Sequence, residues 1–288
     1  MIKPIIKVII PAYNEQDSIA NVITDIPNIV DEVIVISNNS TDNTEINAKT
    51  IDTWAENGWE WAIPISHEVY EKAQRGDWSV VLTPKIPVPK DWFCDLSKAN
   101  LLGLASGGGQ QMPIFKALGA NCTVMDISDV QLQRERDVAK RENYDINIVK
   151  ADMTQTFPFD DESFDIIFHP VANCYNENVY HVWKECYRVL KKGGILLAGL
   201  DNGLSFAFDE EETKICHKLP YNPLKDKALY NESIKNEWGV QFSHTIEEQI
   251  DGQLRAGFNL TNIYQDINTT GLLHDFNVPT FYATRVVK

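Results

Sequence analysis

A glycine-rich stretch and a following aspartate are the residues of this sequence best suited to bind a ligand. The stretch Leu101–Gln111 reads LLGLASGGGQQ, so an apolar run ends in closely spaced glycines. Glycine lets the backbone turn sharply and lets a ligand approach without a collision with Cβ. The next apolar run ends at Asp126, 17 residues after Gly109. Because an acid at that place in a doubly wound sheet accepts hydrogen bonds from ribose hydroxyls, the pair predicts an adenosine site.

A second aspartate helps to choose between cofactors. A dinucleotide-binding turn has the pattern GxGxxG, whereas here Gly107-x-Gly109 is followed by Gln-Gln-Met, without the third glycine. A third apolar run ends in Ala151-Asp152-Met153. An acid at Asp152 suits a hydrogen bond to an adenine amino group. The pattern therefore favours a cofactor with one adenosine group over a dinucleotide.

Regular alternation of strands and helices is needed to bring these residues to one edge of a sheet. Continuous apolar runs are typical of parallel strands buried on both faces, and amphipathic stretches between them predict helices. We expect strands at 99–105, 121–127, 146–152, 164–170 and 193–200, and helices at 111–119, 129–143 and 179–191.

The C-terminal third predicts the rest of the sheet. Residues 202–242 are polar, aromatic and irregular, and we interpret them as an insertion. A helix at 244–257, closed by Gly257, is followed by an antiparallel strand pair at 260–268 and 279–287. The predicted fold class is α/β, with a Rossmann-like, doubly wound sheet of seven strands that ends in an antiparallel C-terminal pair.

With these motifs in view, the region from about Lys49 to Lys288 resembles class I S-adenosylmethionine-dependent methyltransferases. LLGLASGGG is similar to their first motif, and FPFDDESFDIIFHP and YRVLKKGGILLAG to the motifs around their fourth and fifth strands. One departure stands out. The family's first motif has an acid two residues before its first glycine, whereas this chain has Gly103 at the acid position and Ala105 at the glycine position.

The resemblance implies S-adenosylmethionine as the cofactor and methyl transfer to an unidentified acceptor, which we expect to be a small molecule. The cofactor-binding residues that it implies are Ala105, Ser106, Gly107, Gly109, Asp126, Ile127, Asp152, Met153 and His169.

His169 is the candidate catalytic residue. It ends the expected fourth strand, where it would orient the acceptor or take its proton, although a histidine bonded to the backbone is the alternative interpretation. For the substrate pocket we expect Trp54, Trp61, His67 and Asn173, and ordinary aromatic packing is the alternative for the tryptophans. We expect no metal site.

The first 45 residues resemble a different family. VIIPAYNEQDSIANVI and DEVIVISNNSTDNT are similar to the opening of family 2 glycosyltransferases and predict an extra N-terminal β-α-β unit, with a helix near Gln16–Ile26. The acid expected at Ser37 is absent, and the chain has no DxD metal motif. We therefore interpret 1–45 as a fused fragment, 46–98 as a helix and Trp/Pro-rich cover, and 99–288 as the cofactor-binding catalytic domain.

Charge and composition restrict the classes of partner that we expect this protein to bind. A net charge of −15 on 288 residues disfavours nucleic acid and anionic membranes as partners. Five scattered cysteines without a CxxC pair, and no segment typical of a signal peptide or membrane helix, predict a cytoplasmic protein. Two rival functions stay open, a non-catalytic S-adenosylmethionine-binding module and a nucleotide-sugar glycosyltransferase. The sequence predicts neither the acceptor nor the oligomeric state.

Overall fold

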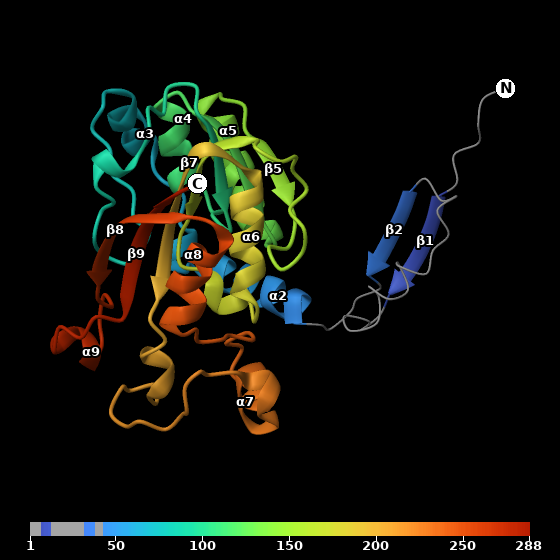
Figure 1. Ribbon diagram of the computed structural model, residues 1–288, viewed down its shortest axis with the longest axis vertical. Coiled ribbons are helices and arrows are strands. Elements are labelled where there is room, and N and C mark those ends of the chain that lie inside the picture. The colour runs from blue at the N-terminus through green and yellow to red at the C-terminus, as the bar shows by residue number, and fades with distance from the viewer. Residues whose placement is uncertain (1–6, 13–31, 38–42) are drawn as a thin grey trace.

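The computed structural model describes residues 7–12, 32–37 and 43–288. Its main sheet has seven strands in the order β5-β4-β3-β6-β7-β9-β8 (Figure 1). Strands β3 to β7 are parallel, and β9 pairs antiparallel with both β7 and β8. The bounds are β3 Asn100–Leu104, β4 Asn121–Asp126, β5 Asn147–Lys150, β6 Phe164–His169, β7 Leu190–Asp201, β8 Asn259–Asp266 and β9 Phe281–Val287. The predicted sheet, with its antiparallel end, is therefore confirmed.

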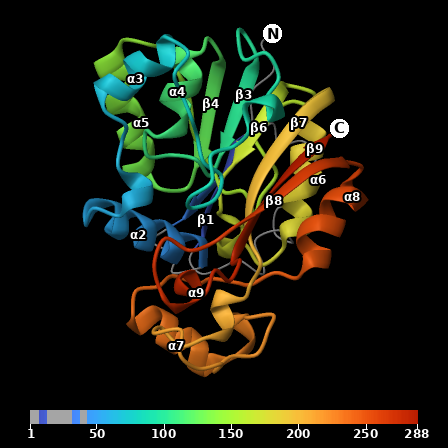
Figure 2. The same cartoon turned by 90° about the vertical axis from the view of Figure 1, so that its left-hand side faces the viewer.

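Helices cover both faces of this sheet. Figure 2 shows α3, α4 and α5 on one side and α6 and α8 on the other. Their ends follow local capping: Ser128 accepts from the Gln131 N–H at the start of α5, and Asn143 ends that helix in the left-handed conformation. The bounds are α2 Asn43–Glu56, α3 His67–Gln74, α4 Gln111–Ala117, α5 Asp129–Glu142, α6 Val179–Val189, α7 Lys227–Lys235, α8 Gly252–Ala256 and α9 Leu272–Asp275.

Alternation along the strands divides the apolar residues between two cores. Leu102 and Ile167 belong to the cluster that contains Trp183 of α6, whereas Leu101 and Ile166 belong to the cluster that contains Phe115 of α4. Successive side chains of a strand point to opposite faces, so each unbroken apolar run supplies both layers.

The helical segments differ in detail from the sequence prediction. Helix α2 begins at Asn43, so the domain boundary predicted between residues 45 and 46 falls inside a helix. The helix at the start of the predicted 46–98 cover ends at Glu56, and a 3₁₀ turn follows at Glu60–Ala62. The helix expected at 244–257 is split into a π-helical turn, Glu247–Asp251, and α8.

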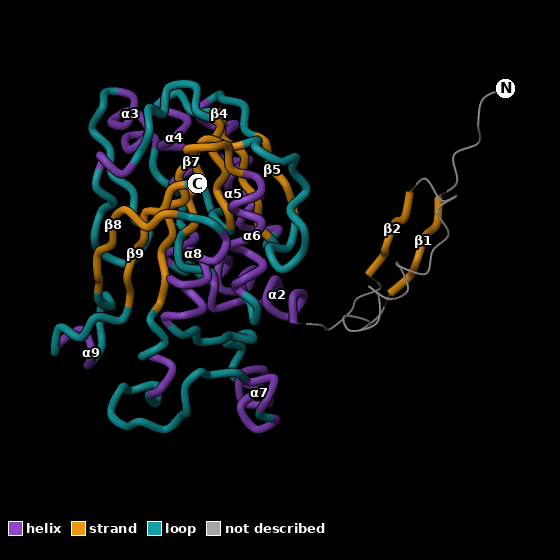
Figure 3. Tube along the Cα trace, in the orientation of Figure 1, coloured by secondary structure: helices purple, strands orange, loops and turns teal. Residues whose placement is uncertain are grey.

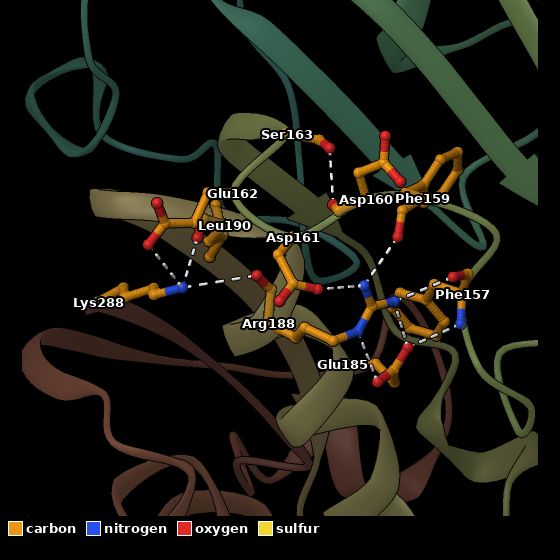
Figure 4. A network of polar contacts seen from close by, with 10 residues as sticks. All are labelled: Phe157, Phe159, Asp160, Asp161, Glu162, Ser163, Glu185, Arg188, Leu190 and Lys288. Atoms are coloured by element: carbon orange, nitrogen blue, oxygen red, sulfur yellow. Dashed lines mark hydrogen bonds and ion pairs between the residues drawn. The ribbon is translucent and has the colours of Figure 1, made fainter.

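A polar network fixes the segment that precedes β6 against α6 (Figure 4). The Arg188 guanidinium donates to the backbone carbonyls of Phe157 and Phe159 and pairs with Asp161 and Glu185. Glu185 in turn accepts from the Phe157 N–H. The hydrogen bonds from Arg188 to these carbonyl oxygens hold the segment before β6 in one conformation, because a buried backbone carbonyl needs a donor.

The N-terminal part forms a sheet of its own. Strands β1, Lys7–Ala12, and β2, Glu32–Ser37, pair in parallel, as the β-α-β pattern predicted. The helix expected between them lies outside the described residues. In the part of the chain that is described, no helix is long and apolar enough to cross a membrane.

The carboxyl ends of the parallel strands carry most of the irregular chain. Figures 1 and 2 show α2, α7 and α9 near the edge at which β7 ends. Figure 3 shows that the 202–242 segment around α7 is mostly loop, as expected for an insertion. The fold therefore gathers its loops at the edge where open α/β sheets bind ligands.

Candidate active site

Two adjoining cavities open at the carboxyl ends of the strands. The smaller has a volume of about 80 Å³ and the larger about 380 Å³. Residues that line both are Trp59, Ala105, Gln131, Val171 and Tyr175. The two cavities therefore meet around Ala105, at the turn that follows β3.

Asp126 is the buried acid of the smaller cavity. Its Oδ2 accepts from the Gly107 N–H at 3.0 Å and its Oδ1 from the Ser128 N–H at 3.0 Å. Burial raises the pKa of Asp126, and the backbone hydrogen bonds oppose that rise. A carboxylate has about four acceptor positions, so Asp126 keeps free positions for two further donors, such as the hydroxyls of a diol.

Asp152 also lines the smaller cavity and already has several donors. Its Oδ1 accepts from the Thr154 N–H at 2.7 Å, and its Oδ2 accepts from the hydroxyls of Thr154 and Thr44. Thr44 comes from α2, so this helix contacts the cavity wall directly. Ile127 and Met153 complete the expected set on this side.

The turn between β3 and α4 contains backbone conformations that few residues adopt. Ala105 has φ +47°, in the left-handed region that favours glycine. A Cβ at Gly107 would lie 2.7 Å from Cβ of Gln131 on α5. The turn is therefore packed tightly against the start of α5, and this packing places Ala105, Ser106 and Gly107 at the cavity walls.

Gly109 does not line either cavity. Its N–H donates to Oε1 of Glu135 at 2.7 Å, beneath the turn. Burial raises the pKa of Glu135 to about 8, so this carboxyl is largely protonated at neutral pH. Glu135 thus supports the glycine turn without adding a second negative charge beside Asp126.

Gly103 is where the family's first motif has an acid, and in this structure the side chain of Met112 packs against it. A Cβ at Gly103 would lie 2.5 Å from Sδ of Met112, whose side chain is fully buried. Met112 therefore fills the space that an acidic side chain would need.

Segments from distant parts of the chain form the walls of the larger cavity. Trp61 lies at one wall, and Leu82 passes so close to β7 that a Cβ at Gly199 would collide with the Leu82 carbonyl. Oδ2 of Asp266, at the end of β8, accepts from the Thr83 hydroxyl and from the N–H of Lys85. This carboxylate therefore ties the Leu82 segment to the sheet.

Asp201, at the end of β7, is the acid of the larger cavity. Its side chain is 7% exposed, Oδ1 accepts from the Gly203 N–H at 3.0 Å, and Oδ2 has no hydrogen-bond partner among the described residues. Burial raises the pKa of Asp201 to about 6, and the nearby His244 limits the rise. A buried carboxyl with an unused oxygen is suited to take a proton.

The expectation that His169 contacts cofactor and acceptor is corrected by its position. The ring is fully buried, with Nδ1 3.0 Å from the Leu104 carbonyl oxygen and Nε2 2.9 Å from Oδ1 of Asn173. It packs edge-on against Trp183 of α6 and lines neither cavity. Both ring nitrogens already have partners, so His169 holds the end of β6 in place.

Three of the four expected pocket residues also lie elsewhere. Asn173 is buried beside His169 and donates to Gln249, and His67 is exposed and pairs with Glu142 on α5. Trp54 packs against Trp59, with ring centroids 5.5 Å apart, but lines neither cavity. Trp61 alone of this set lines the larger cavity.

Several cavity residues were missed at the sequence level. They are contributed by long-range contacts for which a local pattern gives no signal, except that Asp201 ends an apolar strand just as Asp126 does. The missed residues are Thr44, Asn47, Ile51, Val81, Leu82, Thr83, Pro84, Gln131, Tyr175, Asp201, Phe206, Gln241, Asn268 and Phe281.

Metal ligands are not clustered in this part of the molecule. Among the residues that the structure describes, no group of three or more His, Cys, Asp or Glu side chains is placed to hold a metal ion.

Comparison with known proteins identifies two family patterns in the chain. A methyltransferase domain matches residues 102–198, and a glycosyl transferase family 2 pattern matches residues 7–60. The second match extends into α2 and covers a small part of the chain, in agreement with the resemblance seen in the first strands.

Relatives over the greater part of the chain are methyltransferases. The chain is 43% identical over 249 residues to an uncharacterized methyltransferase, YbaJ, of Bacillus subtilis, covering 84% of this chain and 97% of that protein. It is 33% identical over 155 residues to a sterol 24-C-methyltransferase of Kluyveromyces lactis, covering 53% of this chain and 38% of that longer protein.

Among solved structures, an S-adenosylmethionine-dependent methyltransferase from Mesorhizobium loti has the same fold, with a TM-score of 0.57 and 18% identity, covering 69% of this chain and 95% of that one. The order of the strands, the position of the cavities at the carboxyl ends of the strands, and the relative that matches over nearly its whole length all indicate the same family. The chain belongs to the S-adenosylmethionine-dependent methyltransferases, and S-adenosylmethionine is its cofactor.

Proposed function

We propose that this enzyme methylates a small molecule that binds in the larger cavity, with the cofactor's adenosine group in the smaller cavity and Asp201 as the proton acceptor. The observation that carries the proposal is the shared wall: Ala105 and Tyr175 line both cavities, while Asp201 lines the larger one.

The residues of the smaller cavity fit the cofactor. Asp126 has acceptor positions left for a ribose diol, and Ile127 and Met153 supply apolar surface for a purine. Asp152 keeps one acceptor position beyond its three present donors, enough for one amino N–H. Ser106 and Gln111 line the larger cavity beside the turn and offer polar groups for the methionine part.

When bound, the cofactor supplies a methyl group that is already activated. The chain has then to align the acceptor, exclude water and remove a proton from the acceptor. Trp59, Trp61 and Leu82 form an apolar cover suited to the first two tasks. Asp201, with a pKa of about 6, is largely ionised at neutral pH and suits the third.

A small acceptor also agrees with the charge of the site. Among the described residues that line the two cavities there is no lysine or arginine, although nucleic acid binding depends on such cations. The formal net charge of −15 opposes the same partner.

Transfer of a labelled methyl group tests the proposal. The protein is incubated with S-adenosylmethionine labelled in its methyl group and with a bacterial extract divided into low-molecular-weight and macromolecular fractions. We expect label in the low-molecular-weight fraction, with Asp201→Asn transferring at least about a hundredfold less. Label in the macromolecular fraction alone would contradict a small acceptor, and an undiminished rate in Asp201→Asn would contradict the assigned base.

A further inference from the structure

The larger cavity combines a buried acid with aromatic lining residues. Asp201 is more than nine-tenths buried and has one carboxylate oxygen without a hydrogen-bond partner among the described residues. Phe206 and Phe281 line the cavity together with Trp59 and Trp61. Burying a carboxylate is unfavourable unless partners compensate for the lost water, and although the Gly203 N–H and the nearby His244 compensate in part, the unpaired oxygen can accept from one further donor or cation.

Acidic side chains also border the cavity on its outer side. A neighbouring surface hollow shares Trp61, Pro84, Asn268 and Phe281 with the larger cavity, and it is lined by Glu210, Glu211 and Glu212. Glu212 is occupied, because it accepts from Asn268 and from the Leu273 N–H. Glu210 and Glu211 are exposed, and they give the approach to the cavity a negative potential that attracts cations.

We propose that the methyl acceptor is an amine on an apolar, preferably aromatic, skeleton, and that its ammonium group enters past Glu210 and Glu211 and binds the carboxylate of Asp201. This inference rests on the proposed function, since it specifies the acceptor of the same cavity. Three features carry it: the unpaired buried carboxylate, the aromatic residues that line the same cavity, and the acidic approach.

The chemistry balances with the groups present. The bound ammonium ion passes one proton to Asp201, which becomes a neutral carboxyl, and the amine nitrogen regains its lone pair. That lone pair forms the new C–N bond as the bond between sulfur and the methyl carbon breaks. The products are a methylated ammonium ion and neutral S-adenosylhomocysteine, and the proton on Asp201 returns to water.

Burial makes this proton transfer less unfavourable than it is in water. In an apolar environment two opposite charges are costly, and an amine with a carboxylic acid is the neutral alternative. The titratable groups that face Asp201 are His244, Cys174, Tyr175 and Tyr282. Burial raises the pKa of the Cys174 thiol and of both phenols, so these three stay neutral and His244 is the remaining titratable neighbour.

Binding to the complex with S-adenosylhomocysteine tests the proposal without turnover. The probes are matched triplets on one skeleton: 2-phenylethylamine, 2-phenylethanol and 3-phenylpropanoate; tryptamine, tryptophol and indole-3-propanoate; hexylamine, hexanol and hexanoate. Calorimetry at pH 7.5 should show at least one amine binding about tenfold tighter than its alcohol, because a charged partner adds to the apolar contacts. The matching carboxylate should bind more weakly than the alcohol.

Variants separate the contribution of Asp201 to amine binding from that of the acidic approach. Asp201→Asn should reduce the preference for the amine to about twofold or less, since the amide keeps the shape and loses the charge. Glu210→Gln with Glu211→Gln should weaken amine binding about threefold at low salt, whereas Glu232→Gln on α7, away from both cavities, should leave it unchanged.

The outcomes that overturn the inference are distinct from failure of the proposed function. No amine preference in any triplet, an amine preference that survives in Asp201→Asn, or a preference for the carboxylates would each overturn it. When S-adenosylhomocysteine still binds and small molecules are still labelled, these results contradict the amine acceptor and leave the proposed function intact. Absence of that labelling would count against the proposed function itself.

Discussion

The two cavities that meet at Ala105 are built in different ways. In the smaller one, Asp126 and Asp152 follow neighbouring strands and are held by backbone N–H groups and threonine hydroxyls. In the larger one, the walls come from separate loops, and Asp201 keeps an oxygen without a partner among the described residues. The first is organised in advance for one cofactor. The second, which is the cavity proposed for the acceptor, holds a buried acid with an unused oxygen, at a cost in stability.

The largest effect is expected for the chemical step. Asp201→Asn should lower kcat about 10²- to 10⁴-fold with the acceptor that the labelling experiment identifies, because the variant cannot take a proton. In the wild type, kcat/KM should rise with pH through about 6, as Asp201 becomes ionised, and then level off. The acidic limb should be missing in the variant. If the acidic limb of the kcat/KM profile persists in Asp201→Asn, Asp201 is not the proton acceptor, and the contrast drawn between the two cavities is wrong.

The same substitution should have the opposite effect on stability. The pKa of Asp201 is about 6 in the folded chain against its ordinary value of 3.8, so the folded state holds this proton more tightly. Its favourable contribution is complete below about pH 4 and is lost as the pH rises through 6, a change of about 2 to 3 kcal/mol. Asp201→Asn avoids that loss.

Thermal unfolding measures this stability difference. At pH 7.5 the variant should melt about 5 to 10 °C above the wild type, and the two should converge near pH 4. A variant that melts below the wild type at pH 7.5 would mean that Asp201 has a structural partner.

Trp59 tests whether the cavities act as one site. It lines both, so Trp59→Ala should weaken S-adenosylhomocysteine and the acceptor about tenfold each, through lost aromatic contact. Trp54→Ala is the matched control, because Trp54 packs on Trp59 but lines neither cavity. If Trp59→Ala weakened the binding of one ligand alone, the two cavities would not act as one site.

Ala105 should give the smallest effect. The left-handed conformation of Ala105 costs about 1 to 2 kcal/mol, and Ala105→Gly removes this strain. The gain is only part of that amount, because glycine loses more chain entropy on folding than alanine does. We expect a gain of about 0.5 to 1 kcal/mol in the free energy of unfolding, measured in urea, with cofactor affinity within about twofold of the wild type. A destabilised variant would show that the Ala105 methyl group makes packing contacts worth more than the strain.

The fold and the smaller cavity were largely predictable, because their signals are local. Each apolar run became a strand, and Asp126 and Asp152 follow strands that must end at one edge of a parallel sheet. The larger cavity was not predictable in the same way. Leu82, Phe206 and Phe281 meet there through contacts far apart in the chain, and no spacing along the sequence encodes them.

The histidine at the end of β6 illustrates the limit. The sequence places His169 at a strand end, which is correct, but not on which side of the sheet its ring lies. The ring belongs to the layer that packs on α6, beside Trp183, rather than to the ligand edge. The acid at the end of the next strand, Asp201, occupies the cavity instead.

Binding of S-adenosylhomocysteine, measured by calorimetry on the wild type, Asp126→Ala and Asp201→Asn, tests the division of labour most directly. The account predicts one site per chain, an affinity about a hundredfold lower in Asp126→Ala through loss of the two hydrogen bonds assigned to the ribose, and an affinity within about threefold of the wild type in Asp201→Asn. Wild-type affinity in an Asp126→Ala variant that remains folded, or a larger loss in Asp201→Asn than in Asp126→Ala, would contradict it.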